Sequence, residues 1–235
     1  MQNDQTDVKK KPSYLRIMIR IYVIFALMVA VIFLTAGRLD YWQGWIFAAA
    51  YFALLLAATV FYRHNRDLLA ERIKPGPGVK WWDKIFFALY IPSALSVILI
   101  AALDAGRFNW SPELPIALYP LILVLMLFGY CIALWAMRTN KFFSSRVRIQ
   151  TDRGHYVITE GPYRFVRHPG YAAAIVLFPS MAILLGSLYA LIPAAITIVL
   201  LVIRTYLEDV TLQKELPGYL EYTKKTRFRF IPGIW

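Results

Sequence analysis

The chain alternates between long apolar runs and shorter polar segments. Six runs stand out, at Ile17–Ala36, Gly44–Phe61, Ile85–Leu103, Leu114–Met137, Tyr171–Leu185 and Leu188–Leu207. Most of them approach or reach the roughly 20 residues that a helix needs to cross a bilayer, and the fifth lies near the lower limit of about 17. The pattern predicts an all-α, polytopic membrane helical bundle with about six spans.

The sequence predicts the structure of two connections, the one between the last two runs and the one after the second run. Only Gly186 and Ser187 separate the last two runs, which predicts a tight antiparallel hairpin. After the second run, apolar residues recur at helical spacing among charges, so we expect a short helix lying on the cytoplasmic membrane surface near 63–73. The prolines and glycines of 74–78 end that helix, because they cannot continue it.

The longest polar stretch, 138–169, divides the chain into two parts. It is too long to be a simple connector between two spans. We expect a single membrane domain over 1–235. In it, 14–137 holds the four N-terminal spans, and 138–235 holds a polar loop, the helical hairpin and a charged, aromatic tail.

Composition and charge support a membrane protein. Hydrophobic residues make up 59% of the chain and charged residues 17%, unlike an ordinary soluble domain. The net charge of +12 would also suit a protein that binds nucleic acid. The distribution of the charge along the chain distinguishes the two possibilities. With the N-terminus in the cytoplasm, 24 of the 26 Lys and Arg residues fall in cytoplasmic segments, and only Arg38 and Arg107 lie on the other side. This positive-inside bias predicts that both termini are cytoplasmic and that the partners include membrane lipids but no nucleic acid.

The N-terminus resembles a signal peptide because Lys9–Lys11 precede the first apolar run. That run has about 20 residues, more than the usual 7–15 of a signal peptide, and further spans follow. The sequence therefore predicts an uncleaved signal anchor.

The remaining motifs exclude several kinds of site. The single cysteine, Cys131, permits no intramolecular disulfide, and the three histidines lack metal-ligand spacing, so we expect no metal site. No P-loop and no G-x-G-x-x-G motif after a strand is present, which excludes a soluble-type nucleotide fold.

Candidate chemistry begins at 161–171, which places two arginines, a histidine, two tyrosines and two prolines just before the fifth run. Polar, restricted backbone near lipid is costly and needs a reason. Pro169 favours an extended conformation at His168, and Tyr163 and Tyr171 offer faces for stacking and hydroxyls for hydrogen bonds. We expect this segment to bind a charged ligand.

Arg204 and Glu208 form the second candidate. They lie four residues apart at the end of the last run, on one helix face. The spacing fits an arginine that pairs with Glu208 to anchor the helix, and it fits a binding site equally well. Asp209 adds a second carboxylate.

These segments resemble the isoprenylcysteine carboxyl methyltransferase family, particularly its bacterial members, and more distantly the phospholipid N-methyltransferases. The resemblance covers roughly 138–235. The motifs that carry it are Asn140–Phe143, Val147–Gln150, His155–Thr159, Gly161–Tyr163, Arg167–Tyr171, Arg204–Asp209 and Leu216–Tyr222. It implies a membrane-embedded S-adenosylmethionine pocket on the cytoplasmic side, and a location in the bacterial inner (plasma) membrane.

The resemblance also implies roles for individual residues. His155–Ile158 would bind the cofactor largely through backbone groups, while Tyr163 and His168–Tyr171 would cover its adenosine and methionine ends. Arg204 occupies the position of the family's substrate-carboxylate arginine. The implied cofactor-binding residues are Gln150, His155, Tyr156, Val157, Ile158, Tyr163, His168, Pro169, Gly170, Tyr171 and Glu208.

The expected activity is methyl transfer from S-adenosylmethionine to a lipophilic small-molecule or lipidated substrate that enters from the bilayer, at a carboxylate. A carboxylate is already ionised and needs a cation such as Arg204. A lipid amine, the alternative acceptor, would need Glu208 or Asp209 as a base. An NADPH-dependent membrane reductase and a non-enzymatic membrane protein are further alternatives. Thr205–Leu207 replace an acidic run of the eukaryotic enzymes, so a prenylcysteine acceptor does not carry over directly, and the oligomeric state stays open.

Overall fold

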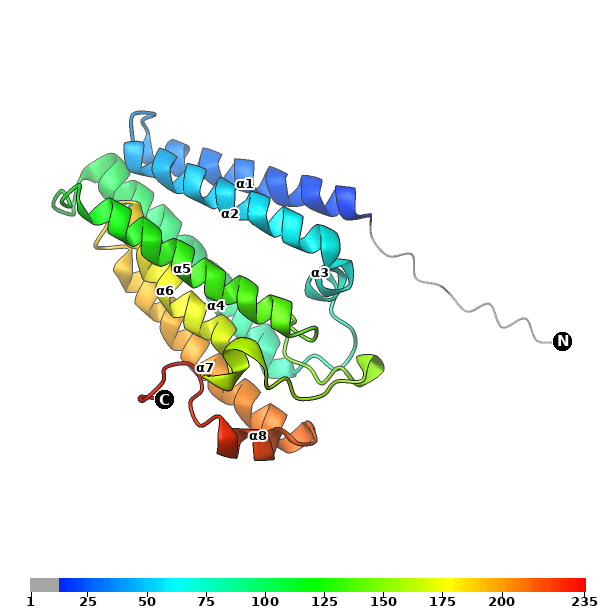
Figure 1. The fold of residues 1–235 in the computed structure, drawn as a ribbon. Helices are drawn as coiled ribbons and strands as arrows, with labels where there is room; N and C mark the ends of the chain where they lie inside the picture. The colour runs from blue at the N-terminus through cyan, green and yellow to red at the C-terminus, as the bar shows by residue number, and fades with distance from the viewer. Residues whose placement is uncertain (1–12) are drawn as a thin grey trace.

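The computed structural model describes residues 13–235, and every regular element in that range is helical (Figure 1). The elements are α1 (Tyr14–Ala36), α2 (Trp42–His64), α3 (Arg66–Ile73), α4 (Trp81–Ala101), the π-helical η1 (Ala102–Phe108), α5 (Leu118–Thr139), the 3₁₀ turns η2 (Thr151–Arg153) and η3 (Gly161–Arg164), α6 (Pro169–Leu184), α7 (Leu191–Glu215) and α8 (Tyr219–Lys225). Lys9–Lys11, on which the signal-anchor prediction depends, lie outside the described residues.

Within residues 13–235, five helices are long and apolar enough to cross a membrane: α1, α2, α4 with η1, α5 and α7. The sixth apolar helix, α6, has only 16 residues. At 1.5 Å per residue it is about 24 Å long, shorter than a hydrocarbon core of about 30 Å. The predicted polytopic helical membrane bundle is confirmed, and the fifth run is indeed the short one.

Helices α5 and α6 pack tightly because a glycine lies at their contact. Gly129 of α5 faces Leu177 and the carbonyl of Ala173 on α6, and a Cβ at Gly129 would lie 3.2–3.3 Å from them. The helix axes therefore approach closely. Figure 1 shows α4 to α7 as one group, with the α1–α2 hairpin against one side.

At the end of the bundle remote from α3 and α8, a buried carboxylate joins η1 to the loops that contain Ser111 and Ser187. Asp104 in η1 has no exposed surface and accepts hydrogen bonds from the Ser111 backbone N–H (2.6 Å) and from the Ser111 and Ser187 hydroxyls (both 2.5 Å). Gly186, with φ +79°, lets the chain turn back just before Ser187. These contacts explain the predicted tight hairpin of α6 and α7.

The predicted surface helix near 63–73 is α3, which begins at Arg66 because α2 continues to His64 and Asn65 breaks the helix. Leu68 and Leu69 are buried, and Leu69 packs against α1. In Figure 1, α3, the loop after α5 and α8 all lie at the same end of the bundle. That end carries the site.

Candidate active site

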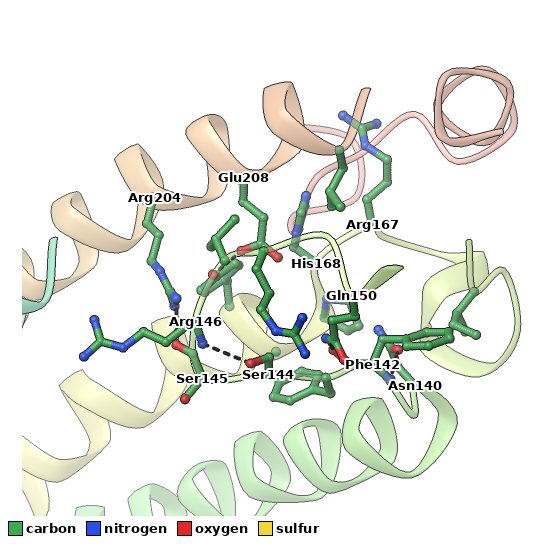
Figure 2. Close-up of a pocket in the computed structure, with 18 of the residues that line it drawn as sticks. Asn140, Phe142, Ser144, Ser145, Arg146, Gln150, Arg167, His168, Arg204 and Glu208 are labelled. Atoms are coloured by element: carbon green, nitrogen blue, oxygen red, sulfur yellow. Dashed lines mark hydrogen bonds between the residues drawn. The ribbon is translucent and has the colours of Figure 1, made fainter. Parts of the chain in front are cut away.

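A cavity of about 340 Å³ opens at this end of the bundle, a size typical of small-molecule sites. Its walls come from the first turns of α4, the loop 140–158, the segment 161–171, the last turns of α7, and α8. The predicted catalytic residue and all the predicted cofactor-binding residues line it: Gln150, His155, Tyr156, Val157, Ile158, Tyr163, His168, Pro169, Gly170, Tyr171, Arg204 and Glu208. Figure 2 shows Arg204 and Glu208 extending from α7 towards the loop.

The loop 140–158 is held in shape by its own side chains. Gln150, which is 1% exposed, donates its amide to the carbonyl of Phe142 (2.6 Å) and accepts a hydrogen bond from Arg153 (2.5 Å). The Phe142 ring packs against His155, with ring centroids 4.5 Å apart. The polar groups of Gln150 therefore position the loop, and a direct contact between Gln150 and the cofactor stays a prediction.

The peptide groups after His155 are left open. Within residues 13–235, no hydrogen bond is made to the backbone N–H or C=O of Tyr156, Val157 or Ile158. Most backbone groups away from water are paired, so a run of open groups beside a cavity is suited to a ligand. The backbone-mediated cofactor contact expected from the resemblance stays a prediction.

The ring of His155 is neutral in the folded protein. Burial lowers its pKa from 6.5 to about 4. Its Nδ1 accepts a hydrogen bond from the backbone N–H of Gln150 (3.3 Å), which only an unprotonated nitrogen can do.

We expect acid to destabilise the protein through His155. Its pKa is lower in the folded state than in the unfolded state, so between about pH 6.5 and pH 4 the unfolded chain binds the extra proton and the free energy of unfolding falls as pH falls. Thermal unfolding at pH 7 and pH 5 measures this loss. His155→Gln should lose less stability over the same interval; an equal loss in both proteins would contradict the assignment.

An ion-pair cluster anchors the loop to α3. Arg148, 3% exposed, binds both oxygens of Glu71 (2.8 Å each) and also Asp152 (2.7 Å). The hydrogen bonds to Glu71 raise the pKa of Arg148. Burial alone would raise the pKa of Glu71, but the hydrogen bonds from Arg148 outweigh it and hold that pKa below its usual value. The sequence does not predict this cluster, because Glu71 and Arg148 lie 77 positions apart and follow no periodic pattern.

The segment 161–171 turns sharply and then starts α6. Gly161 adopts φ +56°, and a Cβ there would lie 2.6 Å from the Thr139 hydroxyl, so the turn needs glycine. Pro169 is the first residue of α6, where a proline's missing N–H costs nothing. The backbone N–H groups of Arg167 and His168 donate to the carbonyls of Phe228 (2.9 Å) and Arg229 (2.7 Å) in the tail. The C-terminal tail thus fixes this wall of the cavity.

Asp209 binds several basic side chains at the wall of the cavity formed by 161–171. It has no exposed surface and accepts two hydrogen bonds from Arg167 (2.8 and 2.9 Å), one from Arg229 (3.1 Å) and one from the Tyr219 hydroxyl (3.0 Å), and it lies 3.1 Å from Nε2 of His168. Asp209 is therefore fully engaged in structure and unavailable as a base for an amine acceptor.

Arg204 and Glu208 do not pair with each other. Nε of Arg204 donates to Asp83 in the first turn of α4 (2.9 Å) and Nη2 donates to the carbonyl of Ser145 (2.8 Å), while Glu208 accepts from the Tyr171 hydroxyl (2.5 Å). The anchoring pair suggested by their spacing is wrong, because α4 presents a buried carboxylate to the guanidinium. Both side chains are left lining the cavity.

Aromatic rings surround the guanidinium of Arg204. Its central carbon lies 4.7 Å from the ring centre of Phe86, 5.1 Å from Phe87 and 5.6 Å from Tyr171. Such rings stabilise a cation and exclude water from it. Phe86 and Phe87 were not predicted as site residues, since aromatic residues near the start of a span are usual in membrane helices.

The comparison with known families matches the part of the chain that builds most of the site. Residues 121–214 match the sequence profile described as the isoprenylcysteine carboxyl methyltransferase (ICMT) family. The match spans nearly all of α5, the loop, α6 and α7, but excludes α3 and α4. A search of curated proteins found no significant match. The chain is therefore a multi-pass membrane protein whose residues 121–214 match the isoprenylcysteine carboxyl methyltransferase family, a family of methyltransferases.

Proposed function

We propose that the protein transfers a methyl group from S-adenosylmethionine to the carboxylate of a lipophilic acceptor that enters from the bilayer. The observation that carries this proposal is the arrangement of Arg204: a cation among aromatic rings, sharing one cavity with Glu208 and the open backbone of 156–158.

The residues present fit S-adenosylmethionine. The open peptide groups of 156–158 suit the hydrogen-bonding edge of an adenine. Among the described residues Glu208 has one hydrogen-bond partner, Tyr171, which leaves acceptor capacity for amino or hydroxyl groups. Tyr163 and His168 line the same space. When bound, the cofactor supplies a methyl group on a positively charged sulfur.

The acceptor end is shaped for an anion. Arg204 uses Nε and Nη2 for protein contacts, and no group within residues 13–235 hydrogen-bonds its Nη1. A guanidinium that is already held in place can bind an incoming carboxylate with little further loss of side-chain freedom. Since a carboxylate is ionised at neutral pH, the side chains need only orient it and keep water out.

The amine alternative has less support. An amine must lose a proton, and Asp209 is saturated by its contacts with cations, which leaves only Glu208 as a base. The reductase alternative has less support too, since Arg148 is paired with Glu71 and Asp152 and Arg167 with Asp209, so neither of these two arginines is free to bind a cofactor phosphate.

Equilibrium binding to the purified protein tests the cofactor. We expect S-adenosylmethionine to bind and NADPH not to bind. Glu208→Ala should weaken S-adenosylmethionine binding by about tenfold, the usual cost of losing one hydrogen bond to a charged group. Isothermal titration calorimetry in detergent measures both ligands.

Glu215→Ala is the matched control for this experiment. Glu215 lies on the same helix but pairs with Lys80 at the surface and does not line the cavity, so its loss should leave the affinity unchanged. Failure of S-adenosylmethionine to bind, tight binding of NADPH, or equal affinities of wild type and Glu208→Ala would each overturn the proposal.

The side of the membrane on which the cavity lies is inferred from the charge distribution. The cavity lies at the end of the bundle that holds the basic segments 138–167 and 204–229. The positive-inside bias assigns that end to the cytoplasm, where a soluble cofactor is available. We propose a bacterial inner membrane with both termini cytoplasmic.

A further inference from the structure

Two arginines flank one buried carboxylate at the acceptor end of the cavity. Asp83 has no exposed surface; one of its oxygens lies 2.9 Å from Nε of Arg204 and the other 3.7 Å from Nη1 of Arg146. Its second oxygen also accepts a long hydrogen bond from the backbone N–H of Val147 (3.4 Å). The two cations and one anion leave this cluster with a net charge of +1.

This arrangement creates a conflict for the proposed acceptor. Its carboxylate must approach the guanidinium of Arg204, which already holds the carboxylate of Asp83. Two carboxylates at one buried cation repel each other, and a buried charge without compensation is costly. A second cation close to Asp83 removes the conflict, and Arg146 is placed to be that cation.

We propose that Asp83 is the resident counter-ion of Arg204 and that Arg146 is a positioning residue that neutralises Asp83 when an acceptor carboxylate binds Arg204. The cluster is then electrically neutral with one singly charged anion bound. It selects a lipophilic monoanion over the corresponding neutral compound or amine. This inference rests on the proposed function.

The contacts of Arg146 support this role. Its guanidinium carbon lies over the ring of Phe87, 3.7 Å from the ring centre, and its side chain is 32% exposed. Its approach to Asp83 is loose, at 3.7 Å to the carboxylate and 3.5 Å to the backbone carbonyl. Arg146 is therefore oriented by the ring without being locked into a tight pair, and it can move closer to Asp83 when a second anion arrives.

The chain segment that supplies the counter-ion lies outside the part that defines the family. Asp83, Phe86 and Phe87 belong to α4, whereas the family match begins at residue 121. The carbonyl of Val147 accepts a hydrogen bond from the backbone N–H of Lys80 (3.0 Å), which docks the loop on the start of α4. Acceptor selection is thus assigned to a contact between α4 and the family segment.

A pair of probes that differ only in charge tests the proposal. N-acetyl-S-farnesylcysteine carries one carboxylate, and its methyl ester is the neutral match. Calorimetric titration in detergent, with the wild type, Arg146→Gln, Asp83→Asn and the double variant, gives the ratio of the two affinities. Asparagine and glutamine keep similar shape and hydrogen-bonding groups but carry no charge.

The wild type should bind the acid more tightly than the ester. Arg146→Gln should weaken binding of the acid by about tenfold, Asp83→Asn should tighten it by a similar factor, and the double variant should return close to the wild type. Affinity for the ester should stay constant in all four proteins, which a merely structural role would not produce.

Three results would overturn the inference: no preference for the acid in the wild type, equal changes for acid and ester, or a double variant no better than Arg146→Gln. The cofactor titration is independent of this test. Normal S-adenosylmethionine binding with any of these results leaves methyl transfer standing and rejects only the counter-ion role. Absent cofactor binding rejects the proposed function itself.

Discussion

Removing the cation of Arg204 is expected to lower kcat/KM for a carboxylate acceptor about 100-fold or more, the scale on which loss of substrate positioning acts. The double variant Arg204→Met, Asp83→Asn is the appropriate protein. Arg204→Ala alone would leave Asp83, which has no exposed surface, without its closest cation, and would confound activity with stability. Methyl transfer to N-acetyl-S-farnesylcysteine measures turnover, and S-adenosylmethionine affinity should change less than about twofold, because its predicted contacts lie elsewhere in the cavity.

Two controls separate charge from other effects. Asp83→Asn alone keeps Arg204 and should retain turnover. Lys214→Met removes a cation from the same helix at an exposed position outside the cavity, and it should behave as wild type. If the Arg204 double variant turned over the acceptor at the wild-type rate, the assignment of Arg204 to the acceptor site would be wrong. Loss of cofactor binding in that variant would show a broader collapse of the cavity.

The spans could be predicted because each one corresponds to a continuous segment of the sequence. A helix that crosses a bilayer needs a continuous apolar run of a certain length, and run length survives in the sequence whatever the helix packs against. The hairpin could be predicted from Gly186 and Ser187 for a similar reason. The π-helical η1 at Ala102–Phe108 could not, because its residue Asp104 is bound by the Ser187 hydroxyl, 83 positions away, and such a contact leaves no pattern in the sequence.

The cavity could be predicted as a set of residues but not as a set of contacts. The motifs between Gln150 and Glu208 lie close in sequence and resemble a family, so their convergence was expected. The partner of Arg204 could not be predicted: a spacing of four made a pair with Glu208 one of two open interpretations, while the observed partner, Asp83, lies 121 positions away. Ion pairs between distant helices leave no periodic signal.

The N-terminal half contributes more to the site than its span pattern indicated. Glu71 of α3 holds the loop through Arg148, and Asp83 and Phe86 of α4 surround Arg204. Each contact required two segments to meet at the membrane surface. From the sequence alone, the same residues read as ordinary charged and aromatic groups at the ends of spans.

The largest effect on stability is expected from Asp209→Ala. It would leave Arg167, Arg229 and His168 facing one another in a buried space without the carboxylate that they share. Breaking a buried ion pair by removing one partner typically costs about 3–5 kcal/mol. Since Arg167 also donates to the carbonyls of Thr226 (2.9 Å) and Arg227 (2.7 Å), the tail should detach with it. Thermal unfolding in detergent and limited proteolysis of the tail measure the two consequences.

The expected result for Asp209→Ala includes function, because the same network forms a wall of the cavity. Once the segment around His168 loosens, S-adenosylmethionine binding should weaken even where the protein remains folded. Glu221→Ala is the matched control: it removes a carboxylate that pairs with Lys224 at the surface, and such exposed pairs contribute about 0–1 kcal/mol. A tail as resistant to protease as in the wild type, with a stability loss no larger than that of Glu221→Ala, would mean that Asp209 does not hold the wall. If the tail lost its protection from protease while S-adenosylmethionine binding stayed intact, the tail would not be required for the binding site.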